Sequence, residues 1–247
     1  MRRSSGGNPA LFHAGMKPKA VAIRIGVMII LRQFRDLLLA CMMASCAVAA
    51  PAAETRRIIG AFAAGDLDGW KIERFQGETR YRLETREGLT GLAARADGSA
   101  SGLYREIEID LTKTPVVTWS WALGEGRAGL DPRVKAGDDH PLRLYFVVKR
   151  GFFNLDTIAL QYVWSLSQPA GTHWTNPFAD GVKQIAIDSG TGDAGTIRRH
   201  RRNLREDFKA LFGEDITRID VTALMTDADN AGGVSQGWYG DITFEAE

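Results

Sequence analysis

The segment 116-VVTWSWAL-123 decides the fold. Polar and apolar side chains alternate along it, which places them on opposite faces of an extended strand. The apolar face carries Val117, Trp119, Trp121 and Leu123. A half-polar strand of this kind is typical of an antiparallel sheet with one wet face, whereas strands of parallel sheets are apolar on both faces. We therefore expect an antiparallel sheet, with the two tryptophans in its core.

Short runs of the same kind recur along the chain, with Gly, Pro, Asp and Asn in the gaps between them. The predicted strands are residues 56–62, 70–75, 79–86, 91–96, 102–110, 116–123, 143–149, 158–166, 183–188, 216–226 and 238–246. Many short strands at such spacing predict a mainly β fold, an antiparallel β-sandwich or barrel.

One helix interrupts the strands, at 203-NLREDFKALFGE-214. Asn203 and Glu206 have the spacing of a capping box, and Gly213 is a natural helix terminator. Apolar residues follow at helical spacing, which predicts one short helix packed on the sandwich. We find no internal repeat or linker, so residues 50–247 are expected to form a single domain.

The first 49 residues have the pattern of a leader. Arg32 and Arg35 precede an apolar stretch from Leu37 to Ala50, which ends in small residues of the A-x-A type. This pattern predicts a secretory signal peptide, and hence a periplasmic or secreted protein. The stretch is shorter than the ~20 residues of a membrane-spanning helix. A buried N-terminal helix is the alternative. Residues 1–27 lie upstream of this pattern and suggest a mis-assigned start codon.

Both cysteines, Cys41 and Cys46, lie inside the predicted leader, so the mature domain has no disulfide. The sequences that end at these cysteines, LLAC and MASC, resemble the site at which bacteria attach lipid to cysteine. A lipid-anchored protein is therefore an alternative to a soluble exported one.

Without the leader the chain has 24 basic and 29 acidic residues, a net charge of −5. Such a domain is a poor match for nucleic acid, which binds cationic surfaces. The basic run 198-RRHRRNLR-205 is interpreted as a solvated connection between a strand and the helix, with an anion site as the alternative.

Catalytic motifs are mostly absent. The chain has no H-E-x-x-H sequence. A strand before 190-GTGDAG-195 is plausible, but TIRRHRR follows where a dinucleotide site needs a helix. Three widely separated histidines, His140, His173 and His200, do not predict a zinc site. Enzyme activity is left open, and a binding role is favoured.

The segment 226-TDADN-230 supplies alternating oxygen ligands that resemble the first half of a calcium loop. The candidate metal ligands are Asp227, Asp229 and Asn230. The closing acid of such a loop is missing, so a calcium site would borrow a ligand from Asp138, Asp139 or Asp241. The alternative is a set of Asx turns without an ion. Structural calcium is the one cofactor that the sequence suggests.

The segment 134-VKAGDDHPLRLYFVVK-149 places two carboxylates just before an apolar strand, with Lys135 and Arg143 on either side. Asp138 and Asp139 are interpreted as a charged corner in which Lys135 or Arg143 pairs with a carboxylate. Pro141 marks the start of the strand. All four charged residues are candidates for contact with a ligand.

These stretches resemble a bacterial family of small exported proteins known only as a domain of unknown function. KAGDDHPLRLY and MTDADN carry the resemblance most specifically, and it extends over about residues 60–245. It implies that both acidic corners belong to the family pattern and gives them no role. The final WYGDITF is similar to the closing strand of galactose-binding-like jelly rolls. This similarity implies that the antiparallel β-sandwich is of jelly-roll or galactose-binding-like type, and it implies no function.

The favoured function is a non-catalytic exported module that binds a carbohydrate, an envelope glycan or another small molecule. Exposed aromatic rings are expected to form the platform, because sugar C–H faces stack on them; the candidates are Trp174, Trp238 and Tyr239. One alternative is a carbohydrate hydrolase or lyase that uses the aspartates at 138–139 and 227–229. Another is a structural envelope protein that uses the arginine-rich segment.

Overall fold

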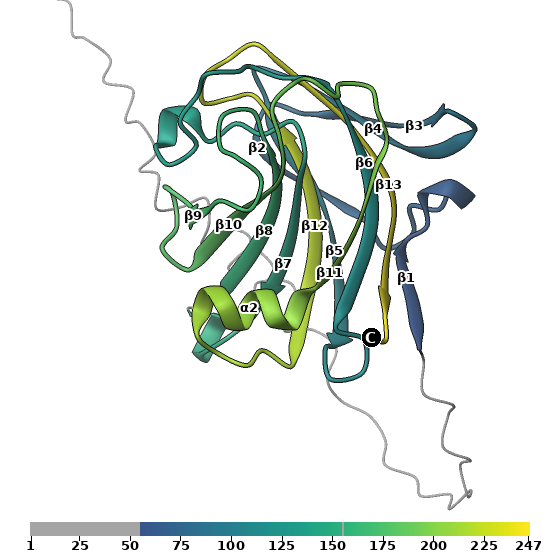
Figure 1. Ribbon diagram of the computed structural model, residues 1–247, viewed down its shortest axis with the longest axis vertical. Helices are drawn as coiled ribbons and strands as arrows, with labels where there is room; N and C mark the ends of the chain where they lie inside the picture. Colours follow the sequence, from purple (N-terminus) through teal and green to yellow (C-terminus); the bar gives the residue numbers. More distant parts are fainter. Residues whose placement is uncertain (1–54, 155) are drawn as a thin grey trace, which may run out of the picture.

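Two β-sheets packed face to face form the part of the chain that the structure describes, residues 55–154 and 156–247 of a computed structural model (Figure 1). The predicted leader and the cysteines of the alternative lipid anchor lie outside these residues. Among the described residues, no helix is long and apolar enough to span a membrane.

The smaller sheet has six strands, all in antiparallel pairs. The order is β11-β6-β13-β4-β3, and β1 pairs with the far part of the long strand β13. The strands are β1 (Arg56–Gly60), β3 (Arg80–Arg86), β4 (Leu89–Asp97), β6 (Val116–Glu125), β11 (Arg198–Asn203) and β13 (Val234–Glu245).

The larger sheet has seven strands in the order β2-β5-β12-β7-β8-β10-β9. These are β2 (Lys71–Gln76), β5 (Ala100–Asp110), β7 (Arg143–Val148), β8 (Ile158–Ser165), β9 (His173–Thr175), β10 (Val182–Ser189) and β12 (Arg218–Asp227). β8 and β10 pair in parallel, an exception to the antiparallel expectation. The chain between them returns along the sheet edge and adds β9 outside β10.

The expectation of a β-sandwich with one packed helix is confirmed. Every predicted strand is present, with ends shifted by a few residues, and the sequence missed β9 and β11. β9 has only three residues. β11 is the arginine run RRHRRN, which has no apolar alternation to signal a strand. It forms the edge of the smaller sheet, where Arg201 pairs with Glu245 at 3.1 Å and His200 with Asp188 at 2.7 Å.

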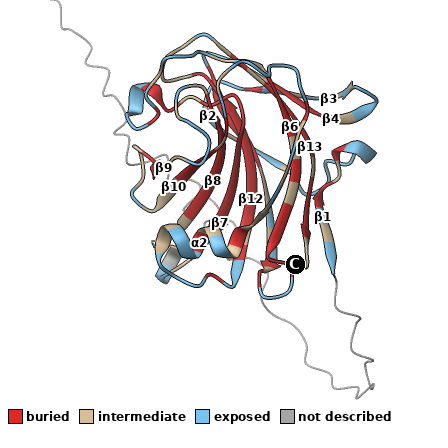
Figure 2. Ribbon diagram, in the orientation of Figure 1, coloured by how far each residue is buried: buried red, intermediate tan, exposed pale blue. Residues whose placement is uncertain are grey.

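The core lies between the two sheets, and Figure 2 shows the buried strands that line it. Trp119 and Trp121 are 3% and 0% exposed, as the alternation in their strand predicts. The Trp119 ring stacks on Tyr162 of the opposite sheet, with 5.1 Å between ring centroids. These aromatic contacts join the two sheets across the core.

The helix α2 (Leu204–Phe212) follows β11 directly and confirms the capping prediction. The Asn203 side chain accepts a hydrogen bond from the backbone N–H of Glu206 at 3.1 Å. Leu204 and Phe208 are buried against the core. Within residues 55–154 and 156–247, three short 3-10 helices lie in the loops: η2 (Phe62–Ala64), η3 (Lys135–Gly137) and η4 (Phe152–Asn154).

Candidate functional site

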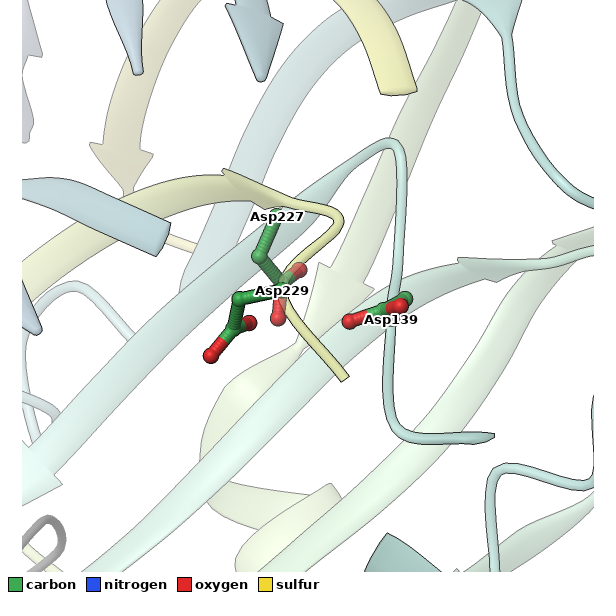
Figure 3. Close-up of side chains that lie close together, drawn as sticks. All are labelled: Asp139, Asp227 and Asp229. Atoms are coloured by element: carbon green, nitrogen blue, oxygen red, sulfur yellow. The ribbon is translucent and has the colours of Figure 1, made fainter. Parts of the chain in front are cut away.

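Two loops bring four aspartates to one end of the larger sheet. Asp138 and Asp139 lie in the loop before β7, Asp227 ends β12, and Asp229 lies in the turn that follows. We call Asp138, Asp139, Asp227 and Asp229 the acidic corner. Carboxylate oxygens of Asp139, Asp227 and Asp229 lie within 4.8 Å of one another (Figure 3). The two acidic segments that the sequence singled out therefore meet in space.

Arg143 is the cation of this corner. β7 pairs with β12 so that Arg143 lies opposite Met225, which brings the guanidinium within reach of Asp227 two residues further on. Nη2 donates to both oxygens of Asp227, at 3.0 and 2.8 Å, and Nη1 donates to Asp138 Oδ2 at 3.3 Å. All three residues are at most 3% exposed. The predicted pairing of Arg143 with a carboxylate is present, and it is buried.

The two carboxyl groups on this arginine have opposite pKa shifts. Burial alone would raise the pKa of Asp138, but the charge of Arg143 and the contacts from His140 and Gln184 outweigh it and lower the pKa to about 2. For Asp227, burial outweighs Arg143, and repulsion from Asp138 and Asp139 adds to it, so the pKa rises to about 8. Asp138 is therefore the ionised partner, and Asp227 takes up a proton near neutral pH.

The outer part of the corner is held by N–H donors. Asp139 accepts hydrogen bonds from the backbone N–H groups of Asn230 and Ala231, at 3.0 and 2.7 Å. The Asn230 side-chain N–H₂ donates to Asp139 at 3.0 Å and to Asp229 at 3.3 Å. Burial and the nearby Asp139 raise the pKa of Asp229. These bonds join distant segments, so they are not the Asx turns of the alternative, in which an Asp or Asn side chain bonds its own backbone two residues on.

A row of polar and aromatic side chains crosses the larger sheet beside the corner, on the face away from the core. Tyr145, Gln161, Gln184 and Trp174 lie on four neighbouring strands at paired positions, and we call them the polar row. Gln184 Nε2 donates to Gln161 at 2.9 Å and to Asp138 at 3.0 Å. Gln184 of the polar row therefore holds the Asp138 carboxylate in place.

Several buried polar atoms here have no hydrogen-bond partner. They are Trp174 Nε1, Gln184 Oε1, Arg143 Nε and His140 Nε2. Nε2 of His140 lies 3.3 Å from Asp138, without hydrogen-bond geometry. Burial and the charge of Arg143 lower the pKa of His140, so its ring is neutral at pH 7. Unsatisfied polar atoms are rare in folded proteins and gather at sites with a role beyond packing.

The prediction that aromatic side chains form an exposed platform is wrong for all three candidates. Trp174, Trp238 and Tyr239 are 7%, 1% and 1% exposed. Trp238 lies on the outer face of the smaller sheet, where its ring fills the space that a Cβ of Gly91 would occupy. The Tyr239 hydroxyl points into the molecule and donates to the Met225 carbonyl at 2.7 Å. None of the three presents a ring face to solvent.

The remaining candidates lie apart from the corner. Lys135 is exposed, and its ammonium lies 5.4 Å from the centre of the Phe178 ring; it pairs with no carboxylate among the described residues. Asp241 accepts a hydrogen bond from the Ala63 N–H at 2.8 Å, at η2. Asp139 is thus the ligand that the calcium prediction would borrow, and Asp241 is not.

Two pockets adjoin this end of the sandwich. The first touches Asp139 and His140 and holds about 10 Å³, the space of a single water at most.

The second pocket has a volume of about 260 Å³ and opens between the β2–β3 and β4–β5 turns. Its lining residues are Gln76, Gly77, Glu78, Arg80, Arg95, Asp97, Gly98 and Ser99. We call it the turn pocket. Only the strand register brings these residues together, so the sequence did not reveal it.

A family model described as "Protein of unknown function (DUF3047)" matches residues 68–243. The match confirms, at the level of the family, the resemblance seen in the sequence. That KAGDDHPLRLY and MTDADN belong to the family pattern stays a prediction. No curated protein matches the sequence.

Solved structures of carbohydrate-active proteins resemble the fold loosely. A family 11 carbohydrate-binding module from Clostridium thermocellum, in complex with a β-1,3-1,4-mixed-linked tetrasaccharide, has a TM-score of 0.43 at 9% identity and covers 77% of this chain and 95% of its own. Endoglucanase cel12A from Rhodothermus marinus has a TM-score of 0.43 at 10% identity, with coverage of 78% and 96%. At these values the likeness assigns neither a ligand nor an activity.

Proposed function

The chain belongs to the DUF3047 family, whose function is unknown, and we propose that it is an exported, non-catalytic carbohydrate-binding module. The turn pocket is the observation that carries the proposal. Its volume of about 260 Å³ is close to the lower end of small-ligand sites, ~300 Å³. The leader pattern supports export, because it has the basic start, apolar stretch and small-residue end of a signal peptide.

The lining of the turn pocket has the chemistry that a polyhydroxylated ligand needs. A sugar hydroxyl both donates and accepts, so it matches a wall that offers guanidinium and amide donors beside carboxylate acceptors. Arg80, Arg95 and Gln76 supply the donors, while Glu78 and Asp97 supply the acceptors. A wall of this kind binds several hydroxyl groups at once and rejects apolar ligands.

The turns around the pocket are held in place. Gln76 Nε2 donates to the Gly98 carbonyl at 3.4 Å, which links the β2–β3 turn to the β4–β5 turn. Gly98 has a φ of 53°, a conformation that glycine adopts without the strain of a Cβ. Its N–H donates to the Gly233 carbonyl at 2.9 Å. Preformed pockets bind better, because little ordering is left for the ligand to impose.

The acidic corner supports the same turns. The Ala228 N–H donates to the Ser99 carbonyl at 3.0 Å, and the Thr79 hydroxyl donates to the Thr226 carbonyl at 2.9 Å. The segment that carries Asp227 and Asp229 is thus hydrogen-bonded to both turns of the pocket. This gives the buried corner a positioning role for a binding site beside it.

Binding of oligosaccharides to the purified protein tests the proposal. We expect saturable binding of at least one oligosaccharide on a glycan array, confirmed by calorimetry. Gln76→Ala should weaken it about two- to tenfold, because one neutral hydrogen bond to the ligand is lost. The control is Gln168→Ala, a glutamine in the loop after β8 and outside the pocket. If no saccharide binds, the proposed function is wrong.

The alternative of a hydrolase or lyase gains less from the geometry. Its aspartates do meet, as that alternative requires, but Asp138 and Asp227 are at most 3% exposed and are bonded to Arg143. Glycosidases need an open space between two carboxyl groups for the sugar, and the pocket beside Asp139 holds only about 10 Å³. These contacts favour the non-catalytic module of the proposal over the enzyme alternative.

A structural calcium ion is the second proposal, favoured by the close approach of Asp139, Asp227 and Asp229. Asn230 turns its N–H₂ group toward these oxygens; rotating the amide by half a turn would present Oδ1 to an ion instead. We expect the melting temperature to be higher in excess calcium than in chelator, because an ion that binds only the folded state stabilises it. Asp229→Asn should remove the difference. Identical melting curves would exclude calcium.

A further inference from the structure

The turn pocket contains two arginines that face each other across neighbouring strands. β3 and β4 pair in antiparallel register with Arg80 opposite Arg95, so both side chains lie on the same face of the sheet. Both line the pocket. Like charges at directly opposite positions destabilise a strand pair, so the arrangement is unfavourable unless an anion lies between the two side chains.

Two arginines and two carboxylates line the pocket, but they do not form two ion pairs with each other. Glu78 is paired with Arg74 at 2.7 Å, and Asp97 approaches Arg95 at 3.8 Å. Arg80 has no ion pair or hydrogen bond with the described residues. Arg74 lies outside the lining; when it is counted, three arginines face these two carboxylates, an excess of one positive charge on a domain expected to be acidic overall.

We propose that the turn pocket binds an acidic saccharide, whose carboxylate lies between Arg80 and Arg95 and whose hydroxyl groups meet Glu78, Asp97 and Gln76. The inference rests on the proposed function and names its ligand class. Guanidinium groups match carboxylates in geometry as well as in charge, since they donate two parallel N–H bonds. The two acceptor carboxylates then serve the sugar hydroxyls, which a bare anion does not have.

The size of the charge favours a carboxylate over a phosphate ester. A carboxylate brings one negative charge, which balances the single excess positive charge of the pocket. A phosphate monoester brings about −1.5 to −2 at neutral pH and would face the nearby Glu78 and Asp97 with charge left over.

Calorimetry on the full-length protein with matched ligands tests the inference. The probes are an oligogalacturonate, the same oligosaccharide as its neutral methyl ester, and inorganic phosphate. We expect the oligogalacturonate to bind more tightly than its ester, and the difference to shrink at high salt. Arg80→Gln should weaken the acidic ligand about ten- to a hundredfold, as expected for a lost charge-assisted hydrogen bond, and leave the ester nearly unchanged.

Arg82→Gln is the matched control. Arg82 lies on the same strand and face two residues further on, pairs with Glu84 and is outside the pocket. It should bind the oligogalacturonate as the wild type does. Equal affinity for acid and ester overturns the acidic assignment and leaves the carbohydrate proposal standing. Phosphate that binds through Arg80 while the oligogalacturonate does not also overturns it. Absence of binding by both saccharides overturns the acidic assignment, and the glycan array then decides whether the proposed function stands.

Discussion

Replacement of Arg143 by methionine lowers the free energy of unfolding by about 3–5 kcal/mol, the cost of removing one partner from a buried ion pair. The methionine fills the space, but it leaves Asp138 and Asp227 buried without their common donor. For a domain of this size the loss corresponds to a fall in melting temperature of about 10 °C or more. Urea denaturation followed by tryptophan fluorescence measures it.

The matched control is Arg205→Met. Arg205 also pairs with an aspartate, Asp215 at 2.7 Å, but both side chains are partly exposed. Exposed pairs of this kind contribute about 0–1 kcal/mol, so this variant should unfold almost as the wild type does. If both variants lost a similar free energy of unfolding, the burial of the Arg143 ion pair would add nothing to stability. That result would contradict the account of the acidic corner.

Asp138→Asn and Asp227→Asn are expected to change the pH dependence of stability in opposite directions. The pKa of Asp138 is about 2 in the folded protein and near 3.8 unfolded, so its charge stabilises the fold above pH 4 and that stability is lost as the pH falls toward 2. Asp138→Asn should remove this acid-side loss and cost about 2 kcal/mol at neutral pH.

Asp227 has the opposite sign, because its folded pKa is about 8. Between pH 4 and pH 8 the folded state keeps a proton that the unfolded state releases, so wild-type stability falls as the pH rises through this window. Asn at position 227 has no proton to lose. The free energy of unfolding of Asp227→Asn should therefore rise relative to the wild type by up to about 1.4 kcal/mol for each pH unit in this window. Denaturation curves at pH 2, 4, 6, 8 and 9 separate the two variants. If the stability of both variants changed with pH in the same way, the opposite pKa shifts of Asp138 and Asp227 would be contradicted.

The sequence predicted what depends on local pattern. Alternation along residues 116–123 placed Trp119 and Trp121 in the core, and Asn203 with Glu206 marked the start of the helix. These features succeed because side-chain direction follows from the strand or helix alone. The same pattern cannot tell which face of a strand stays wet, and the exposure expected of Trp238 was therefore wrong. Its ring is covered on the outer face of the sheet, above Gly91.

Contacts between distant segments were predicted only in part. The sequence singled out the two segments that carry the aspartates of the acidic corner. The burial of these aspartates around Arg143 depends on the register of β7 against β12, which the sequence does not show. The polar row depends on the parallel pairing of β8 with β10, which the half-polar pattern did not suggest. Arg80 and Arg95 lie fifteen positions apart in sequence and become neighbours only through the β3–β4 hairpin.

The strand β11 has a consequence for how copies of this protein meet. A sheet edge offers unpaired backbone groups on which a second molecule can add its own strand, the first step toward fibres. Here that edge carries Arg198, Arg199, Arg201 and Arg202, so two molecules that approach edge to edge bring eight guanidinium groups together. Strand addition at the β9 edge of the larger sheet is limited because β9 has only three residues. Three of these arginines already pair with carboxylates of their own chain, and we expect this charged run to disfavour strand addition at the β11 edge.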